Sequence, residues 1–204
     1  MPQWVLAGSS NNNCVTTLRF ETNDSLERTT FVWKHLRLVS KEFCRAQVKD
    51  SRDWQSLEVI AAHRSPITEA RYILSCLRSE NKKYKQCKHY ENQKAILVLR
   101  NILEDNPKAN DKTMIKLLGN KIASQVRSGC VVSKHLIGHA VNLNMSDGSP
   151  EEVARLKNII LNYRYKVGNK RNKIMLKEKG KGSSRYFHLN FPPYGYNLWV
   201  CPGG

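Results

Sequence analysis

The sequence predicts an α+β fold that is mainly helical, with a basic β-hairpin near the C-terminus. Three observations support this fold class. Apolar residues recur at helical spacing through most of residues 25–105, a capping box precedes the segment that begins at Pro150, and residues 173–191 alternate between apolar and polar around a glycine-rich turn. The 204 residues are enough for one sizeable core or two small domains.

The first half of the chain is expected to begin with short strands at residues 4–7 and 14–20. Helices are predicted over residues 25–48, 51–63 and 66–77, the last with Ser65 as its cap and Pro66 at its first position. The periodic pattern lapses over residues 79–94, as in a solvated helix middle or a polar loop, and we favour the loop. Another helix is expected at residues 95–103. The residues predicted to face inward are Val32, Leu36, Val39, Phe43, Trp54, Leu57, Ile60 or Ala61, Ile67, Ala70, Leu74, Leu77, Ile96, Leu99 and Leu103.

Residues 106–110 are the predicted domain boundary, because they combine a proline with turn-forming asparagines and have no large apolar side chain. The expected domains are a helical region over residues 1–107, a basic module over 108–191, and a Pro/Gly-rich tail or short strand over 192–204. Within the module we expect a helix from Asp111, a β-prone run at 130–132, a helix from Ser133 to about 141, a capped helix over 150–165 that Gly168-Asn169 ends, and strands at 173–178 and 185–191.

This order of elements over residues 111–191 resembles the winged-helix family. In that family the third helix usually approaches a groove, and the hairpin, or wing, contacts the neighbouring backbone. The sequence departs from the pattern in two places. Glu151 and Glu152 at the start of the third helix would face phosphate poorly, and the connection over residues 142–148 is longer than a tight turn. The resemblance therefore implies a contact made by the wing and the far end of the third helix.

The charge of the chain favours a polyanionic partner. Thirty-four Lys and Arg stand against seventeen Asp and Glu, and residues 161–204 hold nine cations against Glu178 alone. Nucleic acid is the first partner that such an excess suggests, and an anionic membrane surface is the second. Interleaved tyrosines can stack on unpaired bases, which favours RNA over DNA. The predicted contact residues are Tyr163, Arg164, Tyr165, Lys166, Lys170, Arg171, Lys173, Lys177, Lys179, Lys181, Arg185 and Tyr186.

A second basic patch lies within residues 78–94, where six cations stand against two glutamates. It is either a second contact or an exposed loop. Its candidate residues are Lys82, Lys83, Lys85 and Lys88.

Metal-like spacing occurs at Cys130, His135 and His139, where a helix would bring the two histidines to one face at i and i+4, a geometry that suits zinc. No fourth ligand is nominated, so we prefer a small buried cysteine with ordinary histidines, and no cofactor is expected. The turn around Lys181 lacks the spacing of a phosphate-binding loop, and no nucleophile, metalloprotease or two-metal signature appears. No catalytic residue is therefore assigned.

The six cysteines include no CxxC pair, and the N-terminus has no basic region followed by an apolar run. We therefore expect free thiols in a nuclear or cytoplasmic protein that is not secreted. No segment approaches the apolar length of a membrane span.

The leading function is non-enzymatic nucleic-acid binding through the phosphate backbone. The first alternative is a protein–protein interaction adaptor that docks partners through residues 25–105, which would show an apolar groove with Trp33 or Trp54 at the surface. The second alternative is a nuclease-type enzyme, which would need Asp, Glu or His side chains converging beside the basic face.

Overall fold

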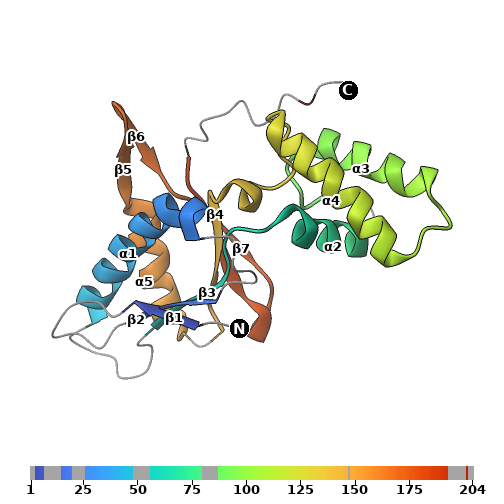
Figure 1. Ribbon diagram of the computed structural model, residues 1–204. Helices are drawn as coiled ribbons and strands as arrows, with labels where there is room; N and C mark the ends of the chain where they lie inside the picture. The colour runs from blue at the N-terminus through green and yellow to red at the C-terminus, as the bar shows by residue number, and fades with distance from the viewer. Residues whose placement is uncertain are drawn as a thin grey trace. The chain divides into compact units, whose positions relative to one another are not determined.

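The computed structural model describes residues 3–6, 15–19, 26–47, 56–79, 87–146, 148–192 and 201. The chain is a mixture of helices and strands (Figure 1). It divides into two compact units, each built from two segments of the sequence: unit 1 is residues 1–63 with 138–193, and unit 2 is residues 64–137 with 194–204.

Unit 1 is built on a six-stranded sheet with the strand order β1-β2-β3-β4-β8-β7. Neighbouring strands are antiparallel, except that β2 and β3 run parallel. A parallel pair needs a crossover, and helix α1, Leu26–Gln47, lies between β2 and β3 in the chain. The strands are β1 (Gln3–Leu6), β2 (Val15–Arg19), β3 (Ser56–Ala61), β4 (Ala140–Asn144), β7 (Met175–Lys179) and β8 (Tyr186–Asn190).

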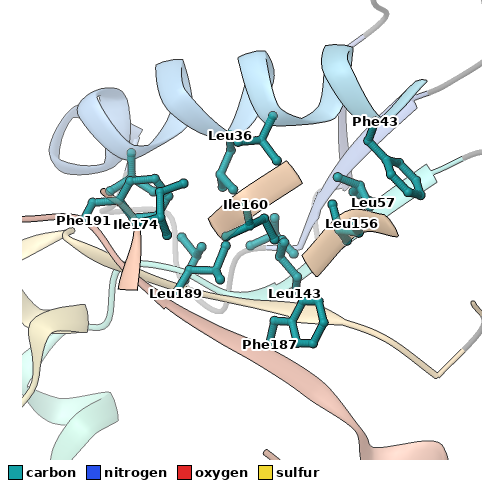
Figure 2. Packing of buried hydrophobic residues seen from close by; sticks show 14 of the residues in the cluster. Leu36, Phe43, Leu57, Leu143, Leu156, Ile160, Ile174, Phe187, Leu189 and Phe191 are labelled. Atoms are coloured by element: carbon teal, nitrogen blue, oxygen red, sulfur yellow. The ribbon is translucent and has the colours of Figure 1, made fainter. Parts of the chain in front are cut away.

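The core of unit 1 lies between this sheet and the helices α1 and α5, Pro150–Asn162. Figure 2 shows Leu36 and Phe43 of α1 and Leu156 and Ile160 of α5 gathered with the apolar residues of the strands. Because side chains alternate along a strand, β3, β4 and β8 each give this core every second residue. The strand residues concerned are Leu57 and Val59 of β3, Val141 and Leu143 of β4, and Phe187 and Leu189 of β8.

Unit 1 also contains a separate two-stranded hairpin, formed by β5 (Arg164–Val167) and β6 (Lys170–Lys173). Gly168 lies in the turn between the strands with φ +57°, a left-handed conformation that glycine adopts without steric cost. Figure 1 shows the hairpin following directly on α5.

The described residues of unit 2 form three helices, α2 (Pro66–Leu77), α3 (Gln93–Asp105) and α4 (Asp111–Arg127), and a 3-10 turn over Lys134–Ile137. Their inward faces form one apolar cluster, in which Ile73, Ile96, Leu99, Met114 and Leu118 are fully buried. Two disulfides, Cys76–Cys87 and Cys130–Cys201, add covalent links within the unit.

Most of the predicted elements with strong local signals are confirmed. Ser65 caps α2 and accepts a hydrogen bond from the Thr68 amide, and Ser149 and Glu152 form the capping box of α5. The polar stretch between α2 and α3 is not helical over residues 87–92, which agrees with the favoured loop. The residues predicted to face inward are buried with three exceptions: Ile67 is 39% exposed, Leu103 is partly buried, and Trp54 lies outside the described residues.

The helix predicted over residues 51–63 is wrong where the structure describes it, because residues 56–61 form strand β3. Leu57 and Val59 are buried and Glu58 between them is partly exposed, which is the two-residue period of a strand. Pairing with β2 on one side and β4 on the other supplies the backbone hydrogen bonds that a helix would have made internally.

The helix predicted from Ser133 to residue 141 is also wrong. The segment forms one 3-10 turn, and then Gly138 adopts φ +69° and the chain enters β4. A glycine with positive φ ends helical geometry, and β4 gains partners on both sides, β3 and β8. The β-prone run at 130–132 is buried but forms no strand.

The winged-helix arrangement is not confirmed, because its second helix is missing and α4 and α5 belong to different units. The segment over residues 106–110 joins α3 and α4, which share the core of unit 2, so the compact units do not divide at the predicted boundary. Of the predicted C-terminal tail, the structure describes Pro192 and Cys201. Gly168-Asn169 is the turn of a hairpin rather than the end of a helix.

Free thiols were expected, but four of the cysteines are joined in the two disulfides of unit 2. The side chains of Cys14 and Cys44 lie outside the described residues. Disulfides persist mainly in oxidising environments, so the cysteines no longer support a reducing compartment.

Candidate nucleic-acid interface

The β5–β6 hairpin gathers four cations on one of its faces. Arg164 lies opposite Lys173, and Lys166 lies opposite Arg171. Paired residues and residues two apart along a strand share a face, so these four side chains project together. All four are exposed to solvent. We call this set the cationic face of the hairpin.

The cationic face places like charges directly opposite one another, an arrangement that destabilises a strand pair. Among the residues that the structure describes, no acidic side chain forms an ion pair with any of the four. Arg164 instead donates hydrogen bonds to the backbone carbonyls of Leu161 and Tyr163. Within the described ranges, the face therefore holds concentrated positive charge without an acidic partner.

The opposite face of the hairpin is anchored by Tyr165, which is 5% exposed and packs in the core of unit 1. Its hydroxyl donates to the carbonyl of Pro192, and its ring lies against those of His35 and Phe31. Base stacking was predicted for this residue, but a ring buried in the core has no free face for a base. Tyr165 thus fixes the direction in which the cationic face points.

Tyr163 is half-buried at the end of α5 and is joined to Nδ1 of His35 by a hydrogen bond of 3.0 Å. Burial raises the pKa of the Tyr163 hydroxyl. Burial, followed by the charge of Lys34, lowers the pKa of His35, which disfavours the protonated ring. Tyr163 could therefore stack on a base only in a position that keeps its hydrogen bond to His35.

The second basic element is the turn that joins β7 to β8, the hairpin predicted from the sequence. Lys177 pairs with His188 and Lys179 with Tyr186 in the register, and exposed Lys181 follows in the turn. The turn depends on Gly180, whose φ is +76°: a Cβ added there would meet the carbonyl oxygen of Ser184 at 1.9 Å. Only glycine therefore fits this position.

One acidic residue lies beside this turn. Glu178 forms ion pairs with Lys157 of α5 and with Arg185. The hydrogen bond from Lys157 is the largest cause of a lowered pKa at Glu178, and Arg185 adds to it. The positive charge of Arg185 is thus partly compensated, whereas the four residues of the cationic face have no ion pair with any acidic residue that the structure describes.

The face of the sheet turned away from α1 and α5 carries polar side chains. Asn144 donates to a carboxylate oxygen of Glu58 at 2.6 Å, and a hydrogen bond of 2.8 Å joins His188 to Asn142. Lys177 is the neighbour of His188 on β7. Glu58 and His188 therefore share a face with a lysine, as the nuclease alternative requires, but each hydrogen bonds to an asparagine.

The metal candidate is corrected by the disulfide. Cys130 is bonded to Cys201 and cannot supply a thiolate ligand. His135 lies in the 3-10 turn and His139 lies beyond Gly138, so the helical spacing is not formed. Within the described ranges, no three His, Cys, Asp or Glu side chains form a group that could hold a metal ion.

The second basic patch falls largely on residues that the structure does not describe. Lys82, Lys83 and Lys85 lie outside the described residues, and Lys88 is exposed.

All four residues of the cationic face were predicted as contact residues from their charge. Their pairing was not predicted, because the sequence pattern indicates a helix that continues through Arg164 towards Gly168. A hairpin signal was present: Gly-Asn is a two-residue turn sequence, and it stands between two basic runs. The geometry defines a basic α+β protein of two compact units, with a cationic hairpin that has no acidic partner in the part of the chain that the structure describes. No family model, curated protein or solved structure matches the chain. Among the described helices, none is long and apolar enough to cross a membrane.

Proposed function

We propose that this protein binds nucleic acid without catalysis, and that the cationic face of the β5–β6 hairpin contacts the phosphate backbone. The observation that carries the proposal is the pairing of like charges, Arg164 with Lys173 and Lys166 with Arg171, with no acidic partner in the described residues. A bound phosphate would supply the missing negative charge and turn mutual repulsion into shared attraction.

The spacing of the four cations suits a chain of phosphates better than a single anion. Residues two apart on a strand are separated by about 6.7 Å, and residues paired across the strands by about 5 Å. Two arginines on diagonal corners, Arg164 and Arg171, can each hold a phosphate with two parallel hydrogen bonds. The lysines beside them act as point charges without a directional requirement.

The β7–β8 turn supports the proposal as a second backbone contact in the same unit. Lys177 and Lys181 are exposed there. Arg185 has Glu178 as its partner and is expected to contribute less.

The expected preference for RNA depended on tyrosines that stack on unpaired bases. Tyr165 is buried and Tyr163 is half-buried, so that argument now rests mainly on Tyr186, which is partly exposed. RNA stays the expected partner in the proposal, and the binding experiment compares it directly with DNA. A nuclear or cytoplasmic location belongs to the same proposal. It rests on the proposed nucleic-acid partner and not on the cysteines.

The test measures the affinity of the purified protein for single-stranded RNA, single-stranded DNA and duplex DNA of equal length over a range of salt concentrations. We expect log K to fall linearly with log salt, with a slope of about 0.7 per phosphate contacted on a single strand. The variant Lys166→Gln/Arg171→Gln should lose about two contacts' worth of that slope. The matched control, Lys108→Gln/Lys121→Gln, removes two exposed cations from unit 2.

Equal losses in the two variants would show that net charge alone matters, and would overturn the assignment to the hairpin. Absence of binding at low salt would overturn the function itself and favour the adaptor, whose partner would be a protein. Trp33, proposed as a surface anchor of that adaptor, is partly buried against the core of unit 1. Cleavage of the nucleic acid that Glu58→Gln abolishes would favour the nuclease alternative.

A further inference from the structure

Helix α4 of unit 2 carries a further basic surface, separate from the residues predicted from the sequence as contacts. Lys112, Lys116, Asn120, Ala123 and Arg127 follow one another at intervals of four, four, three and four residues. At about 100° per residue, these five positions fall within an arc of about 80°. The three cations and Asn120 are exposed. We call these five residues the α4 stripe.

The α4 stripe lacks acidic residues. The helix has one, Asp111 at its first position, and that carboxylate pairs with Arg78. Over the ranges that the structure describes, the three cations of the stripe have no ion pair. Lys112 and Lys116 are like charges at i and i+4, a spacing that weakens a helix by a few tenths of a kcal/mol.

Helices α3 and α5 of the same chain are arranged differently. In α3, Arg100 is followed four residues later by Glu104, and in α5, Glu151 is followed four residues later by Arg155. Both are opposite charges at the spacing that stabilises a helix. Helix α1 also has exposed cations at i and i+4, Arg37 and Lys41, but the next cation in that row, Arg45, pairs with Glu42. The α4 stripe thus differs from these helices in having no acidic partner along its described length.

The far side of α4 is fixed in the core of unit 2. Met114, Leu118 and Ile122 are fully buried, and Gly119 allows α2 to approach so closely that an added Cβ would meet the side chain of Ile67 at 2.4 Å. The stripe is thus presented by a helix that is held along its length, and ordering it for a ligand costs little entropy beyond its own side chains.

We propose that the α4 stripe lies in the major groove of a DNA duplex. The proposal rests in part on the proposed function, because it takes nucleic acid as the partner. The stripe is about 22 Å long, and a helix with its side chains is about as wide as the major groove of B-form DNA, roughly 12 Å. The deep, narrow major groove of double-stranded RNA does not admit side chains in this way, which selects DNA.

The residues of the stripe have distinct tasks in this arrangement. Lys112 and Arg127 at its ends reach the phosphates on either side of the groove, and Lys116 contacts a phosphate or a guanine edge. Asn120 at the centre carries an amide that can pair with the edge of an adenine. The small side chain of Ala123 lets the helix backbone approach the bases.

The test compares two single substitutions on the same helix. Lys116→Gln changes the stripe, and Lys121→Gln removes an equally exposed cation about 140° away around the helix. We expect Lys116→Gln to weaken duplex DNA binding by roughly threefold to tenfold and to lower the salt slope by about one, with no change for Lys121→Gln. Asn120→Ala should reduce the preference among duplex sequences and leave the salt slope unchanged. Far-ultraviolet circular dichroism and the thermal midpoint check that the variants fold.

The inference is overturned if Lys116→Gln and Lys121→Gln have equal effects, or if Lys116→Gln weakens single-stranded RNA as much as duplex DNA. It is also overturned, with the proposed function intact, if Lys166→Gln/Arg171→Gln weakens binding and the stripe variants do not. If the stripe variants alone weaken duplex binding, the stripe stands and the hairpin assignment fails. If the wild-type protein binds no nucleic acid, both fail.

Discussion

The like-charge pairs of the cationic face should destabilise the β5–β6 hairpin. Reversing the sign of one charge should therefore make the hairpin more stable. In the wild-type protein Lys166 and Arg171 are paired across the strands. Substituting Arg171→Glu or Lys166→Glu turns this like-charge pair into an opposite-charge pair. Making both substitutions restores a like-charge pair of the opposite sign. The three variants and the wild type form a double-mutant cycle.

The expected energies follow from the exposure of the pair. Two unit charges about 6 Å apart in water interact by about 0.7 kcal/mol, so reversing one charge changes the pair energy by about 1.4 kcal/mol at most. Cross-strand pairs contribute about 0.2–1 kcal/mol in measured systems. With screening at 0.1 M salt, we therefore expect each single variant to stabilise the hairpin by about 0.3–0.8 kcal/mol, and the double variant to resemble the wild type. Raising the salt concentration from 0.1 M to 1 M should reduce the effect about fourfold.

Amide hydrogen exchange of residues 164–173 measures the opening free energy of this hairpin separately from the rest of the protein. Nucleic-acid affinity, measured on the same four proteins, should follow a different order: wild type, then the single variants, then the double variant. The reasoning is refuted if the single variants open more easily than the wild type. It is equally refuted if affinity follows stability, since a face used for phosphate trades one against the other.

Further predictions concern the framework of both units. Gly180→Ala should destabilise the β7–β8 turn by more than about 2 kcal/mol, whereas Gly182→Ala, with φ +54° but no atom within 4 Å of the added Cβ, should cost about 1 kcal/mol in urea unfolding. Similar costs would show that the close approach at the first glycine is not limiting. Glu69→Gln should lower the stability of unit 2 by about 3 kcal/mol, because Glu69 is 0% exposed and pairs with mostly buried Arg64; a change below 1 kcal/mol would contradict this. In the folded protein the pKa of His35 is lowered from 6.5. The stability that neutral His35 gives to unit 1 should therefore be complete above about pH 6.5 and fall as the pH drops through the lower folded pKa. A His35→Phe variant should lack that pH dependence. Reducing both disulfides should lower the thermal midpoint of unit 2, and an unchanged midpoint would be inconsistent with their covalent role.

Elements with complete local signals could be predicted from the sequence. Ser149, Pro150 and Glu152 satisfy the first turn of α5 through their own side chains and backbone, so no distant contact is needed to start that helix. The β7–β8 hairpin is similar, because its alternation and its glycine turn are both local. For the same reason the apolar positions of α1 were predicted correctly.

The elements that were missed depend on partners far away in the sequence. Strand β3 pairs with β2, about forty residues earlier, and with β4, about eighty residues later, and its short apolar run also fits one face of a helix. The division into units is missed for a related reason, since each unit combines two separate segments of the chain. Disulfide pairing could not be derived from six cysteines, because many connectivities are compatible with their spacing.

The candidate site shows the same limit. The charge of its residues can be read from the sequence. Arg164 and Lys173 become a pair only through the register of β5 and β6, which the sequence does not reveal. Tyr165 was included as an exposed aromatic residue, and only the packing of unit 1 shows that it is the anchor of the hairpin. The apolar spacing of α4 predicts its buried face only. The α4 stripe lies on the opposite, polar face, which that spacing does not describe.

The most direct test of the central claim is the salt dependence of nucleic-acid binding by the wild-type protein and by a variant in which all four cations of the cationic face are replaced by glutamine. The account predicts that the wild type binds and that its affinity falls steeply with salt. It also predicts that the variant keeps its fold, binds more weakly at low salt, and has a salt slope smaller by about three to four contacts. An unchanged slope in a folded variant would contradict the claim that this hairpin contacts phosphate.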